Sequence, residues 1–458
     1  MITVKRLTLM ALFACAASAA SAQQSEPQTG QQPEQWTLQS CIDYAIAHNI
    51  TLQRNRLSVQ SAAVDVKTAQ ANLFPSLSAS VSQRLTNRPN SPATTFVDDN
   101  GNVQTSSTQT SYNGSYGLNL NWTLYNGGRN TRTVKQQQLN TRIAELAVDE
   151  SANSIEENIA QLYVQILYAA EAVKVSESTL AVSQAECDRA KQLLAAGSVA
   201  RSDVAQLESQ VSDDRYQLVT AQSNLQDYKL QLKQLLELDG DMEMNLFIPT
   251  LGDEHVLSPL PAKADVYRAA LTLRPEIESG KLSVDAADLE VRIARGGYIP
   301  TLSLTAGIGT SNINSKDFSF GEQIKQNWNN SLGVTVSIPI FSNRQTKSAV
   351  DKAKLQLLTS QLDLADQQKT LYRTIETLWL DANSAQQQYA AAVEKLRSSQ
   401  ESYDLVQEQF NVGMKNTVEL LTEKNNLLSA QQQMLQAKYT AVLNEQLLNF
   451  YQGETIKL

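Results

Sequence analysis

One stretch without proline or glycine constrains the fold most. It begins at Arg129 and ends at Gly197. Because no helix breaker interrupts it, the stretch predicts a single helix roughly 100 Å long, which no compact domain of ordinary size could bury. Its apolar residues recur at intervals of seven, which predicts a seam against other helices. These residues are Ile159, Ile166, Val173 and Leu180 on one line, and Ile155, Leu162 and Ala169 on the neighbouring line.

A second stretch of this kind runs from Arg344 to Gly413 and repeats the interval of seven. Its seam residues are Ile375, Ala382, Tyr389, Leu396, Tyr403 and Phe410. A period on the order of 200 residues is too long for a solenoid repeat and predicts two copies of one large unit. We expect a first structural repeat over 36–239, a proline-containing linker over 240–263 and a second structural repeat over 264–458. Matching positions include Leu57 and Leu282, Pro75 and Pro300, Tyr125 and Phe341, and Gly197 and Gly413.

The N-terminus predicts export. Residues 1–22 resemble a secretory signal peptide, with a basic start, an apolar run and small residues at the cleavage position. These parts are Lys5-Arg6, Leu7 to Ala17 and Ala20-Ser21-Ala22. Lipid attachment at Cys15 is the alternative, which the bulky Phe13 disfavours. Residues 23–35, rich in Gln, Pro, Glu and Ser, predict a disordered leader.

Charge and cysteine content narrow the function classes. The formal net charge of −9 gives no affinity for nucleic acid, so no nucleic-acid partner is expected. Cys41 and Cys187 remain after signal cleavage, and two cysteines in a long exported chain form no disulfide framework. We interpret them as small apolar residues on helices rather than as a bridge or metal site. After the signal, no apolar run reaches the roughly 18 residues of a transmembrane helix.

Four segments change from helical periodicity to alternation of apolar and small polar residues. They form two strand pairs, 75–125 and 300–341. Their apolar residues are Leu77, Ala79, Val81 and Leu85; Tyr116, Leu118, Leu120, Trp122 and Leu124; Leu302, Leu304, Ala306 and Ile308; and Leu332, Val334, Val336, Ile338 and Ile340. The pattern fits tilted strands that cross a bilayer with one face toward water. A soluble antiparallel sheet with one wet face gives the same alternation.

The number of strands predicts an assembly if the strands cross a membrane. Four strands cannot close a barrel, and an open sheet edge cannot face lipid. Several chains must therefore contribute strands to one barrel; three chains would give twelve, and a lumen wide enough for solutes favours that number over two chains. The polar loops Thr86 to Asn113 and Asn312 to Asn327 are expected outside the cell.

Glycines mark the ends of the long helices. Gly197 and Gly413 are each followed by renewed helical pattern, so we expect helical hairpins that return over about Ser202 to Leu238 and Val418 to Gln452. Before the strands, Trp36 to Asn72 is expected to be mostly helical. Arg274-Pro275 interrupts the corresponding helix of the second half. Because Asn49-Ile50 has no proline, we expect that kink in one copy only.

These features together resemble the TolC family of outer-membrane efflux proteins, from about Trp36 to Tyr451. The marks are Trp36-Thr37-Leu38 with Cys41, Tyr44 and Ala45; Phe74-Pro75 and Ile299-Pro300; Trp122-Thr123-Leu124-Tyr125-Asn126-Gly127-Gly128 and Ile338-Pro339-Ile340-Phe341; and the tips Gly197 to Asp203-Val204 and Phe410-Asn411-Val412-Gly413 to Glu419-Leu420. The resemblance implies a homotrimer with a long α-helical barrel continuous with a transmembrane β-barrel, four strands per chain and internally duplicated. It also implies docking to a periplasmic adaptor protein and an inner-membrane pump, and contact with outer-membrane lipid.

The resemblance also implies a periplasmic gate just past the tip glycines. Asp203 and Glu419 lie at matching positions. This sequence departs from the family in having Glu at the second position and the uncharged Thr422 further on, which puts a second acidic ring in doubt. Like carboxylates brought together by threefold symmetry could select cations. The alternative is that both residues merely complement the dipole of the returning helix.

The tips are also the expected adaptor-docking surface, in the manner of a helix in a groove. The residues are Gly197, Ser198, Arg201, Gly413, Met414 and Lys415. Arg201 and Lys415 could instead tie neighbouring chains together or be solvated surface charges.

No enzyme is expected. His48 and His255 are the two histidines and have no partners at metal-ligand or triad spacing, so neither catalytic residues nor cofactors are predicted. The predicted function is an outer-membrane channel-tunnel that gives small molecules a passive exit driven by an inner-membrane pump. A duct for type I protein secretion uses the same architecture. A coiled-coil surface fibre or adhesin with a β anchor is the structural alternative.

Overall fold

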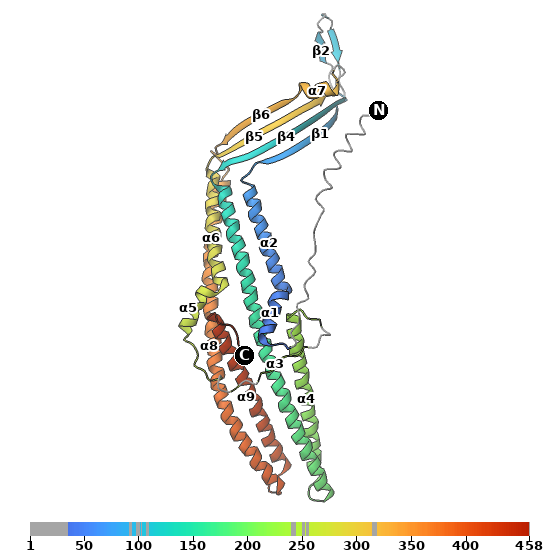
Figure 1. Cartoon of the computed structure of the whole chain (residues 1–458), viewed down its shortest axis with the longest axis vertical. Coiled ribbons are helices and arrows are strands. Elements are labelled where there is room, and N and C mark those ends of the chain that lie inside the picture. The colour runs from blue at the N-terminus through green and yellow to red at the C-terminus, as the bar shows by residue number, and fades with distance from the viewer. Residues whose placement is uncertain are drawn as a thin grey trace.

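The computed structural model describes residues 35–90, 94–97, 101, 103–106, 110–239, 244–249, 252, 256–313 and 318–457. The predicted signal peptide, nearly all of the predicted leader, Cys15, His255 and part of the linker lie outside these ranges. The molecule is very elongated, with a β-sheet at one end and two helical hairpin tips at the other (Figure 1).

Two helices of equal length form the body of the molecule. α3 (Arg129–Ala195) and α8 (Gln345–Asn411) each contain 67 residues. Each turns back into a helix of 35 residues, α4 (Arg201–Leu235) and α9 (Thr417–Tyr451). No helix in the described ranges is both long and apolar enough to cross a membrane.

The seams predicted from the interval of seven are buried along most of their length. Ile159, Ile166, Ile375 and Ala382 are at most 1% exposed. They belong to one large core around the middle of the molecule, where both halves of the chain meet. The long helices therefore pack mainly through residues that the sequence pattern identifies.

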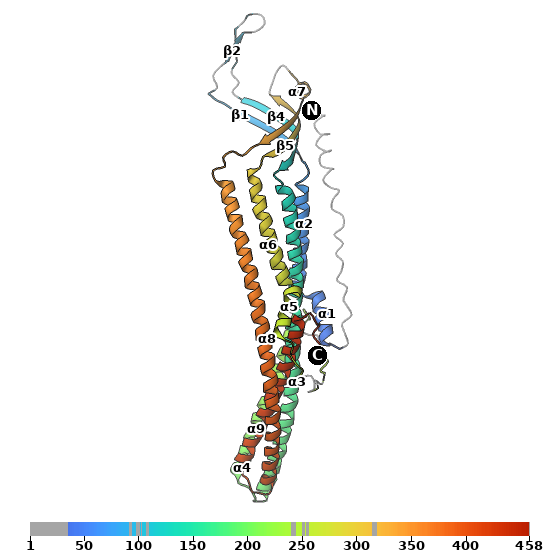
Figure 2. The ribbon, with the colours of Figure 1, turned by 90° about the vertical axis from the view of Figure 1, so that its left-hand side faces the viewer.

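Two pairs of shorter helices precede the strands. They are α1 (Leu38–His48) with α2 (Ile50–Ala71), and α5 (Lys263–Leu273) with α6 (Pro275–Arg295), which a 3₁₀ turn extends over Gly296–Tyr298. α2, α3, α6 and α8 lie side by side beneath the sheet (Figures 1 and 2). α2 and α8 are the edge helices of this layer. Within the layer, α2 packs against α3, and α8 packs against α6.

The prediction that the kink is restricted to the second half is wrong. The first half breaks at Asn49, between α1 and α2, at the position that corresponds to Arg274. The Asn49 side-chain oxygen accepts hydrogen bonds from the backbone N–H groups of Thr51 (2.9 Å) and Leu52 (3.3 Å). An asparagine N-cap starts a new helix as effectively as the proline that starts α6.

The sheet joins the two predicted strand pairs. Its strands are β1 (Ser76–Asn87), β4 (Thr110–Asn126), β5 (Thr301–Ile313) and β6 (Asn329–Ser337), all antiparallel in the order β1-β4-β5-β6. β6 ends before Pro339, earlier than the alternating pattern predicts, because proline has no N–H to donate to a ladder. Because β1 and β6 stand at the two ends of the strand order, they are the edge strands of the sheet within the described residues.

Two elements appear in segments expected to be loops. β2 (Thr94–Val97) pairs with β3 (Val103–Ser106) beyond the sheet, and α7 (Phe320–Gln326) lies between β5 and β6. The side chain of Ser319 caps α7, and Glu322 Oε2 accepts a hydrogen bond from the Ser319 N–H (2.8 Å). This Ser-x-x-Glu capping box is a sequence signal that would have predicted α7.

The described part of the linker packs against the helices of both halves. Trp36 and Leu246 form an isolated parallel bridge, and the Trp379 indole donates to the Pro261 carbonyl (3.0 Å). Tyr163 on α3 donates its hydroxyl to the Phe247 carbonyl. The described part of the linker therefore lies against the long helices α3 and α8 near the middle of the molecule.

Candidate functional site

Both hairpin tips turn through a glycine in the left-handed conformation. The φ angle is +75° at Gly197 and +77° at Gly413. In both turns the residue after the glycine donates its N–H to a carbonyl five residues earlier: Ser198 to Leu193 (2.8 Å) and Met414 to Gln409 (2.9 Å). This is a Schellman motif, in which glycine avoids the steric cost that a Cβ atom brings at positive φ.

The structure places both predicted gate carboxylates in the first turn of a returning helix. Asp203 Oδ2 accepts from the Ala200 N–H at 3.4 Å. Glu419 Oε2 accepts from the Asn416 N–H at 3.1 Å, and the Asn416 side chain accepts from the Glu419 N–H at 2.9 Å. Both residues thus lie in the first helical turn, where the alternative interpretation expects them, and both also make capping contacts; the gate assignment stays a prediction.

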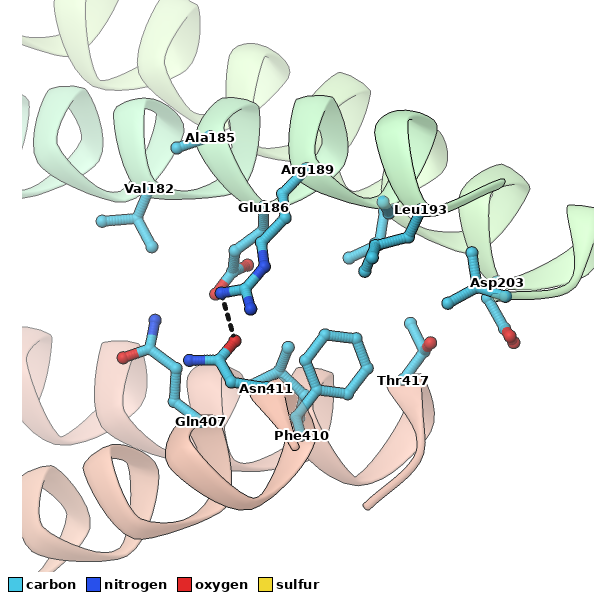
Figure 3. Close-up of a pocket in the computed structure, with 14 residues that line it drawn as sticks. Val182, Ala185, Glu186, Arg189, Leu193, Asp203, Gln407, Phe410, Asn411 and Thr417 are labelled. Carbon is cyan, nitrogen blue, oxygen red and sulfur yellow. Dashed lines mark hydrogen bonds between the residues drawn. The ribbon is translucent and has the colours of Figure 1, made fainter. Parts of the chain in front are cut away.

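Asp203 and Glu419 differ in their surroundings. Asp203 lines a cavity between the two hairpins, opposite Phe410 and Thr417 (Figure 3). Glu419 is paired with Lys415, whose Nζ lies 2.6 Å from Glu419 Oε1. The hydrogen bond from Lys415, and after it the one from the Asn416 backbone, lowers the pKa of Glu419 below its usual 4.5. Glu419 is therefore held ionised by contacts within its own tip.

The predicted docking residues lie at the far end of the hairpins from the sheet. Ser198 and Arg201 are exposed, and Met414 is 75% exposed. Val412 and Val418 flank Met414 and are 71% and 57% exposed. The second tip thus presents a small apolar surface, whereas Lys415 is engaged with Glu419.

A buried polar cluster that the sequence analysis did not identify joins the two hairpins close to the tips. Lys424 on α9 lies with its Nζ 3.3 Å from Asp214 Oδ2 on α4 and 3.7 Å from Glu186 Oε2 on α3. Lys424 also donates to the Ser183 hydroxyl, which donates to Asp214. On α8, Tyr403 donates its hydroxyl to Glu186 Oε1 at 2.8 Å. All four helices of the two hairpins contribute.

The cluster is shielded from water. The side chains of Lys424 and Asp214 are 5% and 3% exposed. Burial, the largest effect, raises the pKa of Tyr403, so that its hydroxyl stays a donor to Glu186. Because removing one member of a buried ion pair costs about 3–5 kcal/mol, this cluster fixes how the hairpins sit against each other.

A sequence signal for this cluster exists. Lys424 falls between Leu420 and Leu427 on the apolar side of α9, and Asp214 follows Val211 on the apolar side of α4. A charged residue at a core position of a seam predicts a buried partner. Its partner cannot be identified from spacing, because it lies on another helix.

A hydrogen bond across the hairpins lies nearer the tips. Arg189 Nη1 donates to Asn411 Oδ1 at 2.6 Å, linking α3 to the end of α8 (Figure 3). Together with the buried cluster, it leaves a cavity between the hairpins that is lined by side chains of both.

A model of the family described as outer membrane efflux protein matches residues 41–237 and 266–454. The chain belongs to this family. The resemblance to TolC is thereby confirmed, and the protein is an efflux channel of the outer membrane; members of the family are channel proteins rather than enzymes.

Relatives and a solved structure agree with this assignment. The outer membrane efflux protein BepC of Brucella suis biovar 1 is 25% identical over 417 residues, covering 91% of this chain and 85% of BepC. The outer membrane protein TolC of Escherichia coli is 23% identical over 320 residues, covering 69% of this chain and 64% of TolC. The crystal structure of CusC superimposes with a TM-score of 0.77 at 21% identity, covering 91% of each chain, and shows that the fold is shared.

The described part of this efflux protein holds no group of three or more His, Cys, Asp or Glu placed to bind a metal ion. Cys41 and Cys187 are both free and buried, and burial raises the pKa of the Cys41 thiol to about 12. His48 stacks on Tyr44 at 4.0 Å between ring centroids. Cys41 and Cys187 each belong to a cluster of buried apolar side chains.

Proposed function

We propose that three copies of this chain form one channel-tunnel that gives small molecules a passive exit across the periplasm and outer membrane. The observation that carries the proposal is the open four-stranded sheet, with β1 and β6 as edges, at the end of an equally open layer of long helices. The edge strands of the sheet need strands to pair with, and the edge helices of the layer need helices to pack against. Neighbouring copies of the chain would supply both.

The exposed side chains of the edge strands support a barrel of twelve strands from three chains. Leu77 and Val81 on β1 are 70% and 73% exposed, and Leu332 and Val334 on β6 are 77% and 63% exposed. Apolar side chains at alternating positions suit contact with lipid. Pairing of β1 with β6 of the next chain would satisfy the backbone groups of both edges, which lipid cannot do.

The edges of the helical layer support the same arrangement. On α8, Leu355, Leu358 and Leu362 are 64%, 55% and 71% exposed at helical spacing. On α2, Leu57 and Val64 are 61% and 57% exposed, one heptad apart. We place these two surfaces against each other between neighbouring chains, where they would close an α-helical barrel continuous with the β-barrel.

Internal duplication accounts for the order of elements. The repeats at 36–239 and 264–458 each contain a short helix, a longer helix, two strands of the sheet and a long helical hairpin. In the proposed trimer, the two similar units of each chain would give the tunnel approximate sixfold symmetry. The described residues of the intervening segment, 244–249 and 256–263, would lie around its middle.

The tips are proposed to form the periplasmic gate and to receive the adaptor. Asp203 and Glu419 would line the constriction, and the exposed surface around Met414 would contact an adaptor hairpin through apolar side chains. Energy would come from an inner-membrane pump, because a passive duct supplies none.

Conductance of the purified protein in planar bilayers tests the function. A trimer measured by light scattering, together with ion-conducting steps, is the expected result. Absence of conductance from the unmodified protein and from the gate variants described below, whether trimeric or monomeric, would favour the fibre hypothesis. Transport of a small dye, compared with that of a polypeptide in cells carrying the matching pump, separates drug efflux from protein secretion.

The gate assignment has its own test. Asp203→Ala with Glu419→Ala should raise the resting conductance or change cation selectivity. Glu208→Gln, a charge neutralisation on the exposed side of α4, is the matched control. Currents unchanged from those of the unmodified protein would remove the gate role and leave the helix-capping role.

A further inference from the structure

α7 packs on the apolar face of the sheet, at the end far from the helices (Figure 1). Cross-strand pairs that define this face include Leu77 with Leu120, Leu118 with Ile308, and Ala306 with Leu332. Tyr116 and Thr310 form a further pair on the same face, because side chains two positions apart on a strand point the same way. The Tyr116 ring meets the Phe320 ring of α7 edge to face, with 6.2 Å between centroids. The Thr310 hydroxyl donates to the Ile324 carbonyl of α7 at 2.7 Å.

The position of α7 coincides with the end of the apolar stretch on β5. Apolar side chains run from Leu302 to Ile308, and Thr310 and Asn312 follow on the same face. Leu302 and Asn312 lie about 33 Å apart along an extended strand at about 3.3 Å per residue. At the roughly 40° tilt of membrane strands, this is about 25 Å along the membrane normal, the height of the apolar band of outer-membrane barrels. α7 therefore lies where that band would end.

Aromatic side chains are exposed around α7. Phe318 is 49% exposed, and Phe320 and Trp328 are each 57% exposed. Trp328 continues the alternation of β6 that places Leu332 on the apolar face. At the opposite end of this face Tyr125 is 51% exposed. Aromatic rings at both ends of an apolar band are typical of the two membrane–water interfaces, where a ring contacts acyl chains and head groups together.

The N-terminus of α7 is suited to a place beside lipid. The Glu322 N–H donates to the Ser319 hydroxyl at 3.4 Å, and the Ser319 N–H donates to Glu322 Oε2 at 2.8 Å. These two bonds satisfy backbone groups that lipid could not satisfy. Glu322 and Lys325 are both exposed and would meet water and head groups.

We propose that α7 and its three aromatic side chains bind the outer leaflet of the outer membrane, at the boundary between acyl chains and head groups. This inference rests on the proposed function, in which the apolar face of the sheet meets lipid. It differs from the expectation that the segment from Asn312 to Asn327 is a loop in water. α7 then lies beside the channel wall rather than across the channel mouth, and it fixes the depth of the sheet in the membrane.

Spin labelling of the full protein in phospholipid vesicles tests this proposal. Phe320→Cys and, as a separate variant, Trp328→Cys each introduce one labelling position. The native Cys41 and Cys187 are 0% and 1% exposed, so they should take up no label. Collision rates with molecular oxygen, which concentrates among acyl chains, and with a water-soluble nickel chelate report the depth of each label. The second variant keeps the test valid if loss of the Phe320 ring disturbs α7.

Two reference positions bracket the expected result. A label at Ser198→Cys on the exposed hairpin tip reports water, and a label at Val334→Cys reports the middle of the apolar face. The ratio of oxygen to nickel collisions at Phe320→Cys and Trp328→Cys should be severalfold above that at Ser198→Cys and below that at Val334→Cys.

Two results would overturn the proposal. Labels on α7 as accessible to nickel as the one at Ser198→Cys would place the helix in water. Labels shielded from both reagents would place it against a neighbouring copy of the chain. Val334→Cys separates this inference from the proposed function, because a water-accessible label there would show that the apolar face does not meet lipid and would overturn both.

Discussion

Lys424 on α9 lies 3.3 Å from Asp214 on α4, and neither side chain is more than 5% exposed. The two residues belong to different hairpins and are brought together by the packing of the hairpins against each other. Glu186 and Tyr403 extend the contact to α3 and α8. A change at Lys424 therefore acts on the arrangement of the hairpins more than on either hairpin alone.

Replacing Lys424 with Met should lower the unfolding free energy by about 3–5 kcal/mol, because Asp214 and Glu186 would be left buried without a cation. Thermal unfolding in detergent measures the loss. The matched control is Lys369→Met on the exposed surface of α8, which should change stability by less than about 0.5 kcal/mol. Adding Asp214→Leu to Lys424→Met should recover part of the loss, and a further additive loss would contradict the pairing.

Arg274 connects three elements near the middle of the molecule. Its guanidinium lies 2.7 Å from Glu157 on α3 and 4.0 Å from the centre of the Tyr451 ring on α9. A second ion pair joins Arg274 Nε to Glu276 Oε1 at 3.2 Å. Arg274→Lys keeps the charge but loses the planar stacking and one of the two ion pairs, and should cost about 2–3 kcal/mol. Arg268→Lys is the control, since Arg268 is 77% exposed and pairs on the surface with Asp265. Equal midpoints for the two variants would show that the stacking contributes nothing.

Gly197→Ala and Gly413→Ala should each cost about 1–2 kcal/mol of local stability at the tips. A Cβ atom at either position would meet no neighbouring atom within 4 Å, so the cost comes from the positive φ angle alone. Gly321→Ala in α7 also enters open space without a positive φ and should not destabilise. Hydrogen exchange of the tip amides detects the effect, and unchanged protection would contradict the assigned backbone strain.

The first turn of α9 should open in acid. The pKa of Glu419 is lowered below 4.5 in the folded tip, chiefly by Lys415. The stabilisation is therefore complete above 4.5 and disappears as the pH falls through the lowered pKa. Hydrogen exchange of the Glu419 amide as a function of pH measures this. Lys415→Met should move the transition to higher pH, whereas an unchanged transition would exclude the ion pair as its cause.

Comparison of the predicted with the observed strands and loops shows which elements local sequence pattern predicts. Alternation placed all four strands of the sheet, but β6 stops at Ser337 because Pro339 removes a donor. The Ser319 capping box is a local sequence signal for α7 within a segment expected to be a loop. The break at Asn49 differs from the prediction because an asparagine N-cap starts a helix without a proline. Each of these differences has a local cause that the sequence contains.

Local sequence specifies the long helices, the glycine turns at Gly197 and Gly413 and the alternating strands, because each depends on residues a few positions apart. Which side chains meet between elements depends instead on the three-dimensional packing of the helices. Lys424 contacts Asp214, and Arg274 contacts Tyr451, because helices far apart in the chain pack against each other. Periodicity specifies which face of a helix is buried, whereas the partner and axial position of each buried charge depend on how whole helices align.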